Sequence, residues 1–197
     1  MSARDLIVGA ILAGGEGRRI GGRKSAVDLA GQTLSARVAA TLAPHVAALA
    51  VVGDDEAAAA LRATALNDPP GAPKGPLAGI GAALDWAAAR KADWLVTSPC
   101  DTPLLPGDLI ARLHAAAEGQ ADLAFARTAD GDHPLAAIWS VALAPRIGAL
   151  LHDGVHPPLH TLVEDLRGVH VWFADAAAFL NINTPEDLAR ARALLAR

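Results

Sequence analysis

The hydrophobic positions of the chain form short continuous runs that alternate with longer stretches of helical spacing. Residues 6–12 are a continuous apolar run, which is typical of a strand buried on both faces of a sheet. In residues 34–42 apolar side chains recur every four positions, and Pro44 ends the pattern. This spacing predicts a helix. We therefore expect a buried first strand, a loop and then a helix.

The same patterns continue to the end of the sequence. They predict a short strand and turn at 27–31, further strands at 46–52, 64–66, 94–98, 123–126, 135–140 and 169–173, and helices at 54–62, 78–90, 106–117, 142–151, 159–166 and from Pro185 onward. Strands that alternate with helices of about 10–15 residues favour a mostly parallel sheet with helices on both faces. In such α/β folds ligands bind beyond the carboxyl ends of the strands, so the loops after the strands are the candidate sites of chemistry.

The composition excludes several classes of protein. The chain has 197 residues, 52% of them hydrophobic, and a net charge of −4. It has the size of one domain, which we assign to residues 1–197, and is too apolar to be disordered. Cys100 is the only cysteine, so we exclude a disulfide scaffold and expect a reducing compartment, the cytoplasm. No apolar stretch is long enough to span a membrane, and the mild acidity argues against nucleic acid as a partner.

The loop after the first strand combines backbone freedom with positive charge. Five glycines and four basic residues lie in it: Gly14, Gly15, Gly17, Gly21, Gly22, Arg18, Arg19, Arg23 and Lys24. Since Glu16 is its only acid, the loop has an excess of three positive charges within an acidic chain. Glycines let backbone N–H groups converge on an anion, and basic side chains neutralise it. We therefore expect the loop to bind a polyphosphate.

Two familiar phosphate-binding motifs do not fit this loop. In a P-loop the last glycine is followed directly by lysine, whereas Arg23 separates Gly22 from Lys24. The dinucleotide-binding motif requires a third glycine at the position of Ile20. A solvated basic turn is the structural alternative.

Asp101 follows the predicted strand at 94–98. A carboxylate at this edge can ligate Mg²⁺, with Mn²⁺ as an alternative, because Mg²⁺ takes one or two protein carboxylates together with substrate phosphates. The structural alternative is that Asp101 or Thr102 only caps the next helix. Cys100 could be proposed as a nucleophile, but we favour a small, buried and unreactive side chain.

Two further loops carry candidate ligand contacts. Asp68 ends the third strand, and Gly75 and Gly79 belong to a Gly-Pro-Leu-Ala-Gly sequence that leads into a helix, where an anion or a base can approach. Asn181 and Asn183 point the same way in an extended segment and suit a heterocycle or a phosphate. Ordinary loop geometry and helix capping are the respective alternatives.

Together these motifs resemble those of one enzyme family. The sequence contains L-A-G-G-x-x-x-R-x-G-G-x-K from Leu12, then G-P-L-A-G, P-C-D-T-P, H-P and N-I-N-T-P-E-D-L. The first motif alone marks a wider nucleotidyltransferase superfamily, but the set, spread over residues 7–188, resembles molybdenum cofactor guanylyltransferase. The resemblance implies a Rossmann-like three-layer sandwich of the nucleotide-diphospho-sugar transferase type. It also implies transfer of GMP from GTP to molybdenum-molybdopterin, which forms molybdopterin guanine dinucleotide and pyrophosphate.

The resemblance further implies roles for individual residues. Those that would bind GTP are Leu12, Ala13, Gly14, Gly15, Gly22, Lys24, Asp68, Gly75, Gly79 and Asp101. Those that would be catalytic are Arg19, Lys24 and Asp101, with Asp101 also the metal ligand. Those that would bind molybdopterin are His133, Asn181 and Asn183. The N-terminal part would thus mainly bind GTP, and the C-terminal part mainly molybdopterin.

The chain departs from the family pattern at two places. Relative to the more common G-G-x-D-K, one residue is missing between Gly22 and Lys24, and Arg23 replaces the acid. After the second strand the family often has asparagine, whereas this chain has Gly53. We therefore do not carry a ligand contact over to position 53.

Several alternatives stay open at this level. A sister enzyme would use CTP, or transfer a nucleotide to another phosphorylated acceptor, although Ala13-Gly14-Gly15 favours guanine by resemblance. A non-catalytic nucleotide-binding module would keep the first loop but would not need Asp101. We expect a monomer whose candidate protein partners are molybdenum-insertion proteins and the chaperones of molybdoenzymes.

Overall fold

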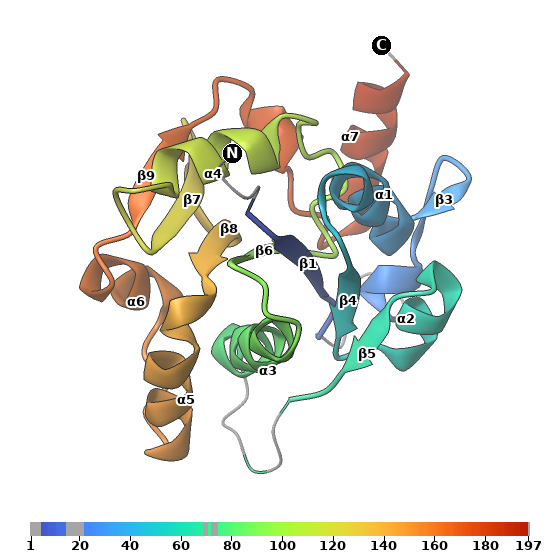
Figure 1. Ribbon diagram of the computed structural model, residues 1–197. Helices are drawn as coiled ribbons and strands as arrows, with labels where there is room; N and C mark the ends of the chain where they lie inside the picture. Colours follow the sequence, from blue (N-terminus) through green and yellow to red (C-terminus); the bar gives the residue numbers. More distant parts are fainter. Residues whose placement is uncertain (1–4, 15–21, 69–70, 72–74, 197) are drawn as a thin grey trace.

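The computed structural model describes residues 5–14, 22–68, 71 and 75–196. Within these residues a seven-stranded sheet forms the centre of the molecule, with the strand order β5-β4-β1-β6-β8-β7-β9 (Figure 1). Its strands are β1 (Ile7–Leu12), β4 (Leu49–Val52), β5 (Thr64–Leu66), β6 (Trp94–Pro99), β7 (Leu123–Thr128), β8 (Gly131–Ser140) and β9 (Val169–Trp172). The short strands β2 (Asp28–Leu29) and β3 (Gln32–Thr33) form a separate hairpin.

All strands of the large sheet run in one direction except β8. β1 pairs in parallel with β4 and β6, and β4 pairs in parallel with β5. β8 is antiparallel to its neighbours β6 and β7, and β9 is parallel to β7. The carboxyl ends of β1, β4, β5 and β6 therefore meet at one edge of the sheet, and β8 begins at that edge. The predicted mostly parallel sheet is confirmed.

Helices cover both faces of the sheet (Figure 1). One face packs against α1 (Leu34–Leu42), α2 (Asp55–Leu61) and α4 (Leu109–Ala117), and the other against α3 (Pro76–Ala89), α5 (Ala144–His152) and α6 (Leu159–Asp165). The last helix, α7 (Pro185–Leu195), packs beside the β2–β3 hairpin. The short 3-10 turns are η2 (Lys24–Ala26), η3 (Ala43–His45), η4 (Val141–Leu143) and η5 (Ala176–Phe179). This arrangement is the expected three-layer α/β sandwich.

Neighbouring residues of the central strands belong to opposite layers of the core. In β1, Ala10 packs on the side of α3 and Ile11 on the side of α1, and both are fully buried. In β6, Leu95 and Val96 divide in the same way. Because helices cover both faces, every position of such a strand can be apolar. This explains the continuous apolar run at residues 6–12.

Several predicted boundaries differ from the structure; the strand expected at 46–52, for example, begins only at Leu49. The helix expected at 78–90 begins at Pro76, whose ring suits the first helical position and whose missing N–H costs nothing there. The helix expected from residue 106 begins at Leu109. Pro106 lies in the turn before it, where the carbonyl oxygen of Pro106 accepts a hydrogen bond from the N–H of Leu109. The strand expected at 135–140 begins earlier, at Gly131, where it pairs with the end of β7.

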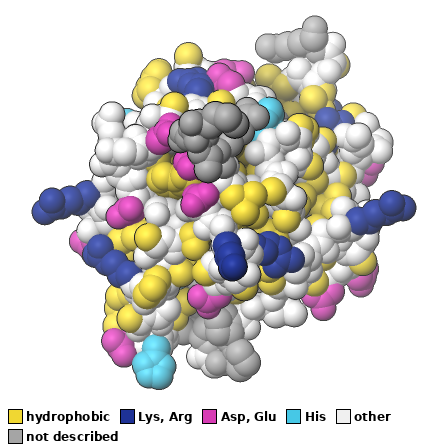
Figure 2. Space-filling model, in the orientation of Figure 1, with side chains coloured by type: hydrophobic (Ala, Val, Ile, Leu, Met, Phe, Trp, Pro, Cys, Tyr) yellow, Lys and Arg dark blue, Asp and Glu magenta, His cyan; other side chains and the backbone are white. Residues whose placement is uncertain are grey.

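The outer surface is mixed in character. Figure 2 shows acidic and basic side chains interspersed over the face seen in Figure 1. In the part of the chain that the structure describes, the exposed large hydrophobic side chains come from four separate segments: Leu6, Val155, Trp172 and Leu195. Among the described residues, no helix combines the length and the apolar character that crossing a membrane requires.

Candidate functional site

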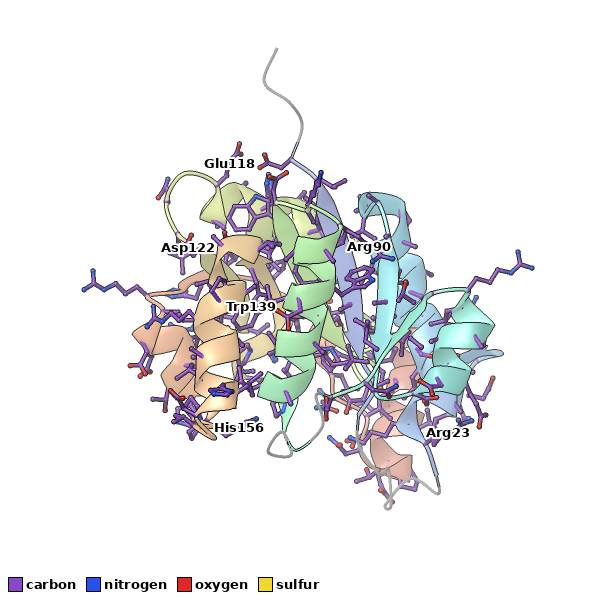
Figure 3. All side chains as sticks on the ribbon, turned by 60° about the horizontal axis from the view of Figure 1, so that its bottom comes forward. Arg23, Arg90, Glu118, Asp122, Trp139 and His156 are labelled. Atoms are coloured by element: carbon purple, nitrogen blue, oxygen red, sulfur yellow. The ribbon has the colours of Figure 1, made fainter. Side chains whose placement is uncertain are left out.

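A pocket of about 750 Å³ lies at the carboxyl edge of the sheet. Its lining residues are Leu12, Ala13, Gly14, Lys24, Val52, Gly53, Asp68, Gly75, Pro76, Gly79, Pro99, Cys100, Asp101, Leu135 and Asn181. This edge faces downward in Figure 3, where Arg23 and His156 are labelled, whereas Glu118 and Asp122 lie at the opposite end of the sheet. The volume suits a small-molecule ligand, and the position is the one at which open α/β sheets bind ligands.

Bare backbone forms one wall of the pocket. Gly53 has a φ of +81°, and a Cβ there would lie 3.0 Å from Cα and 3.1 Å from N of Gly14. At Gly79 a Cβ would lie 3.2 Å from Cγ1 of Val52 and 3.6 Å from Oδ1 of Asp68. Glycine at both positions thus lets β1, β4 and α3 approach one another closely. A ligand can contact the main chain here without meeting side chains.

Lys24 and Asp101 form an ion pair in the pocket. Nζ of Lys24 lies 2.7 Å from Oδ2 of Asp101, and it also donates a hydrogen bond to Oδ1 of Asn183. The Lys24 side chain is 20% exposed and the Asp101 side chain 12%. A lysine beside a carboxylate at a strand end places a cation and a potential metal ligand side by side. Both are groups that a nucleotide's phosphates require.

The second carboxylate oxygen of Asp101 has an unused bonding capacity. Oδ1 is buried and has no hydrogen-bond partner among the described residues. Such an oxygen is suited to ligate a divalent cation. The described parts of the chain hold no group of three or more His, Cys, Asp or Glu side chains that could hold a metal by itself. A single carboxylate fits Mg²⁺ only where substrate phosphates and water complete its coordination.

Main-chain hydrogen bonds fix Asp101 between two segments. The N–H of Cys100 donates to the carbonyl oxygen of Leu12 at 3.0 Å, which ties the end of β6 to the end of β1. The N–H of Ile182 donates to the carbonyl oxygen of Asp101 at 2.8 Å. The segment before α7 is therefore attached directly to the Asp101 loop.

The turn that carries Lys24 is tied to the start of α2. Oγ of Ser25 donates to the carboxylate of Asp54, which also accepts from the N–H of Ala57 at 3.0 Å. Nη1 of Arg23 lies 3.3 Å from the same carboxylate. Burial raises the pKa of Asp54, but these hydrogen bonds and the nearby positive charge outweigh burial, so the pKa lies below its usual value. Asp54 therefore stays ionised at neutral pH, caps α2 and holds the turn.

Cys100 lines the pocket but is only 4% exposed. Burial, with a further contribution from the charge of Asp101, raises the pKa of its thiol to about 12. The thiol is therefore protonated at neutral pH, and the thiolate is the nucleophilic form. These surroundings support the interpretation of Cys100 as an unreactive packing residue.

His133 lies in β8, near the pocket. Its ring stacks on Phe179 with 4.8 Å between the ring centroids, and its Nε2 is 2.9 Å from Oγ1 of Thr128. Burial lowers the pKa of His133, so the ring is neutral at pH 7. Leu135, two positions further along β8, lines the pocket itself.

Most of the residues predicted from the sequence line the pocket, namely Leu12, Ala13, Gly14, Lys24, Asp68, Gly75, Gly79, Asp101 and Asn181. Gly22, His133 and Asn183 are not among the lining residues, although Asn183 contacts Lys24. Gly15 and Arg19 lie outside the described residues.

The sequence analysis did not single out several lining residues, namely Val52, Gly53, Pro76, Pro99 and Leu135. No contact was carried over to Gly53 because this position departs from the family pattern, but Gly53 lies in the pocket wall. Its place directly after a predicted strand could have identified it. Leu135 could not be identified in this way, because it lies in β8, which runs antiparallel to its neighbours β6 and β7.

Comparison with known proteins identifies the family of this chain. Residues 9–169 match the MobA-like NTP transferase domain. The chain is 44% identical over 192 residues to the molybdenum cofactor guanylyltransferase of Cereibacter sphaeroides, covering 96% of this chain and 97% of that protein. It is 45% identical over 196 residues to that of Rhodobacter capsulatus, covering 94% of each. The solved structure of molybdopterin-guanine dinucleotide biosynthesis protein A from Archaeoglobus fulgidus has a TM-score of 0.75 and 26% identity, covering 96% of this chain and 98% of that chain. The chain therefore belongs to the family of MobA-like NTP transferases.

Proposed function

We propose that this chain transfers GMP from GTP to molybdenum-molybdopterin, forming molybdopterin guanine dinucleotide and pyrophosphate. The observation that carries the proposal is the Lys24–Asp101 ion pair in a pocket at the carboxyl edge of the sheet. The names of the relatives at 44% and 45% identity support guanine as the base and molybdenum cofactor as the acceptor.

The nucleotide is assigned to the part of the pocket formed by β1, β4 and α3. There the exposed backbone of residues 12–14, together with Gly53, borders the guanosine. Asp68 is suited to accept hydrogen bonds from the ribose hydroxyls, because its carboxylate lies where Gly79 leaves room beside α3. Lys24 binds the phosphates, and Arg19 is proposed to assist it.

The acceptor supplies the nucleophile. An ionised oxygen of its phosphate attacks the α-phosphorus of GTP and forms a new P–O bond. The bond from the α-phosphorus to the oxygen that bridges to the β-phosphorus breaks, and its electron pair leaves with pyrophosphate. The attacking oxygen carries no proton at neutral pH, so no general base is required. Lys24 neutralises charge that develops on the leaving group.

Asp101 is the residue that would hold Mg²⁺, or Mn²⁺ in its place, through Oδ1, which is buried and has no hydrogen-bond partner in the part of the chain that the structure describes. A bound divalent cation would supply charge neutralisation on the phosphates. Oδ2 of the same carboxylate remains paired with Lys24. Asp101 thereby keeps the lysine beside the position where phosphates would lie.

The acceptor is assigned to the neighbouring part of the pocket. Asn181 lines it, and Leu135 adds an apolar surface. His133 lies two positions from Leu135 in β8 and stacks on Phe179, and Asn183 contacts both Asn181 and Lys24. This division places GTP mainly against the N-terminal part of the chain and molybdopterin mainly against the C-terminal part.

The proposal extends to finer properties. We propose that residues 1–197 act as a single domain and a monomer in the cytoplasm, and that turnover requires Mg²⁺. Molybdenum-insertion proteins and the chaperones of molybdoenzymes are the proposed protein partners. Removal of divalent cations with a chelator should stop turnover, and added Mg²⁺ should restore it.

Pyrophosphate release tests the main proposal. Purified protein, Mg²⁺ and molybdenum-molybdopterin are incubated with GTP, CTP or ATP in parallel, and each reaction is repeated without the acceptor. Release that requires both GTP and the acceptor is the expected result. Release that requires the acceptor but occurs with CTP and not with GTP or ATP would instead identify a cytidylyltransferase. GTP binding without release would identify a non-catalytic module, unless another phosphorylated acceptor restores release.

A further inference from the structure

Asn183 makes a contact that its predicted role does not require. Its Oδ1 accepts a hydrogen bond from Nζ of Lys24, 159 positions away in the sequence. Its Nδ2 donates to Oδ1 of Asn181 at 3.0 Å. Because a lysine ammonium has only donors, Asn183 must direct its oxygen toward Lys24 and its NH₂ toward Asn181. The contact with Lys24 thus determines the orientation of the Asn183 amide.

The backbone on both sides of Asn183 is firmly held. The N–H groups of Asn183 and Thr184 both donate to Oδ2 of Asp187, at 3.0 and 2.9 Å, and Oγ1 of Thr184 accepts from the N–H of Asp187. This capping box begins α7. On the other side, Ile182 is hydrogen-bonded to the carbonyl of Asp101. Asn183 therefore presents its amide from a rigid support.

Lys24 consequently has two acceptors at defined positions. Asp101 comes from the end of β6 and Asn183 from the segment before α7. A lysine side chain has many rotamers, and ordering it upon ligand binding is unfavourable. Two fixed acceptors impose this order before the ligand arrives.

We propose that Asn183 is a positioning residue that acts through Lys24. It holds the ammonium group where the triphosphate of the nucleotide is bound. The proposal rests on the function proposed above, and it assigns to Asn183 a role toward the nucleotide rather than only toward the acceptor.

The test is a double-mutant cycle with Asn183→Ala and Lys24→Met, in which the dissociation constant of GTP is measured without acceptor. Asn183→Ala should weaken GTP binding about tenfold, the effect of losing one hydrogen bond to a charged group. In the Lys24→Met background the same substitution should change binding by less than about twofold. If Asn183→Ala weakened GTP binding about tenfold in the Lys24→Met background as well, the proposal would be overturned, because Asn183 would then act independently of Lys24.

The reactivity of Lys24 supplies a readout that does not depend on activity. Acylation of each lysine by acetic anhydride is followed by mass spectrometry, and Lys91, which is exposed, is the internal standard. An ammonium must give up its hydrogen bonds before it reacts, so Asn183→Ala should speed acylation of Lys24 about tenfold relative to Lys91. Asn183→Asp keeps an acceptor oxygen at the same place and should restore the slow rate. Equal Lys24 rates in wild type and Asn183→Ala would contradict the proposal.

The two proposals fail in different ways. If wild-type protein neither binds GTP nor releases pyrophosphate, the proposed function is wrong, whatever the labelling result. If wild-type protein is active but Asn183→Ala raises only the KM for the acceptor and leaves GTP binding unchanged, the positioning role is wrong. Asn183 is then an acceptor contact alone.

Discussion

Lys24 and Asp101 pair across 77 positions of sequence, with 2.7 Å between Nζ and Oδ2, while Oδ1 of the same carboxylate is buried and has no hydrogen-bond partner among the described residues. The proposed function gives this carboxylate two different tasks. Oδ2 orients the ammonium group of Lys24, and Oδ1 would ligate a divalent metal ion.

Asp101→Asn tests this double task. The amide keeps an oxygen for Lys24 but removes the negative charge that Mg²⁺ requires, so pyrophosphate release should fall at least about 10²-fold. The rate is measured over a range of Mg²⁺ concentrations. Asp122→Asn, at the opposite end of the sheet in Figure 3, is the matched control and should keep the wild-type rate. Near wild-type turnover by Asp101→Asn would refute the metal assignment.

Gly53→Ala tests the close approach of β4 to β1. Gly53 and Gly31 have nearly the same φ, +81° and +83°, but a Cβ meets the Gly14 backbone only at position 53. Gly31→Ala should therefore cost about 1 kcal/mol from backbone strain alone. Gly53→Ala should cost about 2 kcal/mol or more and should also weaken GTP binding. Urea unfolding and GTP titration measure the two effects. Equal costs for the two variants would show that the contact with Gly14 is unimportant.

Asp54 predicts a component of acid sensitivity. Its pKa is lowered in the folded state, so its ionisation stabilises the fold above the ordinary carboxyl pKa of about 3.9. That stabilisation is lost as the pH falls through the lower, folded-state value. Asp54→Asn keeps a residue that caps helices well but has no charge to titrate. Its urea midpoint should therefore depend less on pH than that of wild type between about pH 3 and pH 6. An unchanged pH dependence in Asp54→Asn would contradict this account.

Cys100 should not react in the folded protein. With a thiol pKa of about 12 and 4% exposure, it offers very little accessible thiolate to Ellman's reagent at about pH 8. Concentrated urea should release one equivalent of the coloured product, since the chain has one cysteine. Rapid reaction under native conditions would show that the end of β6 opens readily.

The sequence permits prediction of much of the pocket lining because these residues stand out locally. Glycines and basic residues, Lys24 among them, cluster after β1, and Asp101 closely follows the apolar strand β6. Hydrophobic patterns also reveal the strands themselves, because burial on both faces leaves continuous apolar runs. These features depend only on neighbouring residues.

Other parts of the site depend on contacts between distant segments. The hydrophobic pattern does not show in which direction a strand runs. It therefore could not predict that β8 begins beside the pocket and that Leu135 lines it. The role of Gly53 depends on the backbone of Gly14, and the contact of Asn183 depends on Lys24. Resemblance placed Asn183 at the site, but only the structure shows which atom it meets.

The contact between Lys24 and Asn183 also sets the order in which the site can form. During synthesis Lys24 leaves the ribosome well before Asn183, so the strand that precedes it can be made long before the amide that orients its ammonium. Contacts between residues so far apart carry a high loop-closure cost and form late in folding. A nascent or partly folded chain could therefore possess the glycine-lined wall without an oriented lysine. The capacity to hold a triphosphate in a defined position would then arise only when the segment before α7 docks.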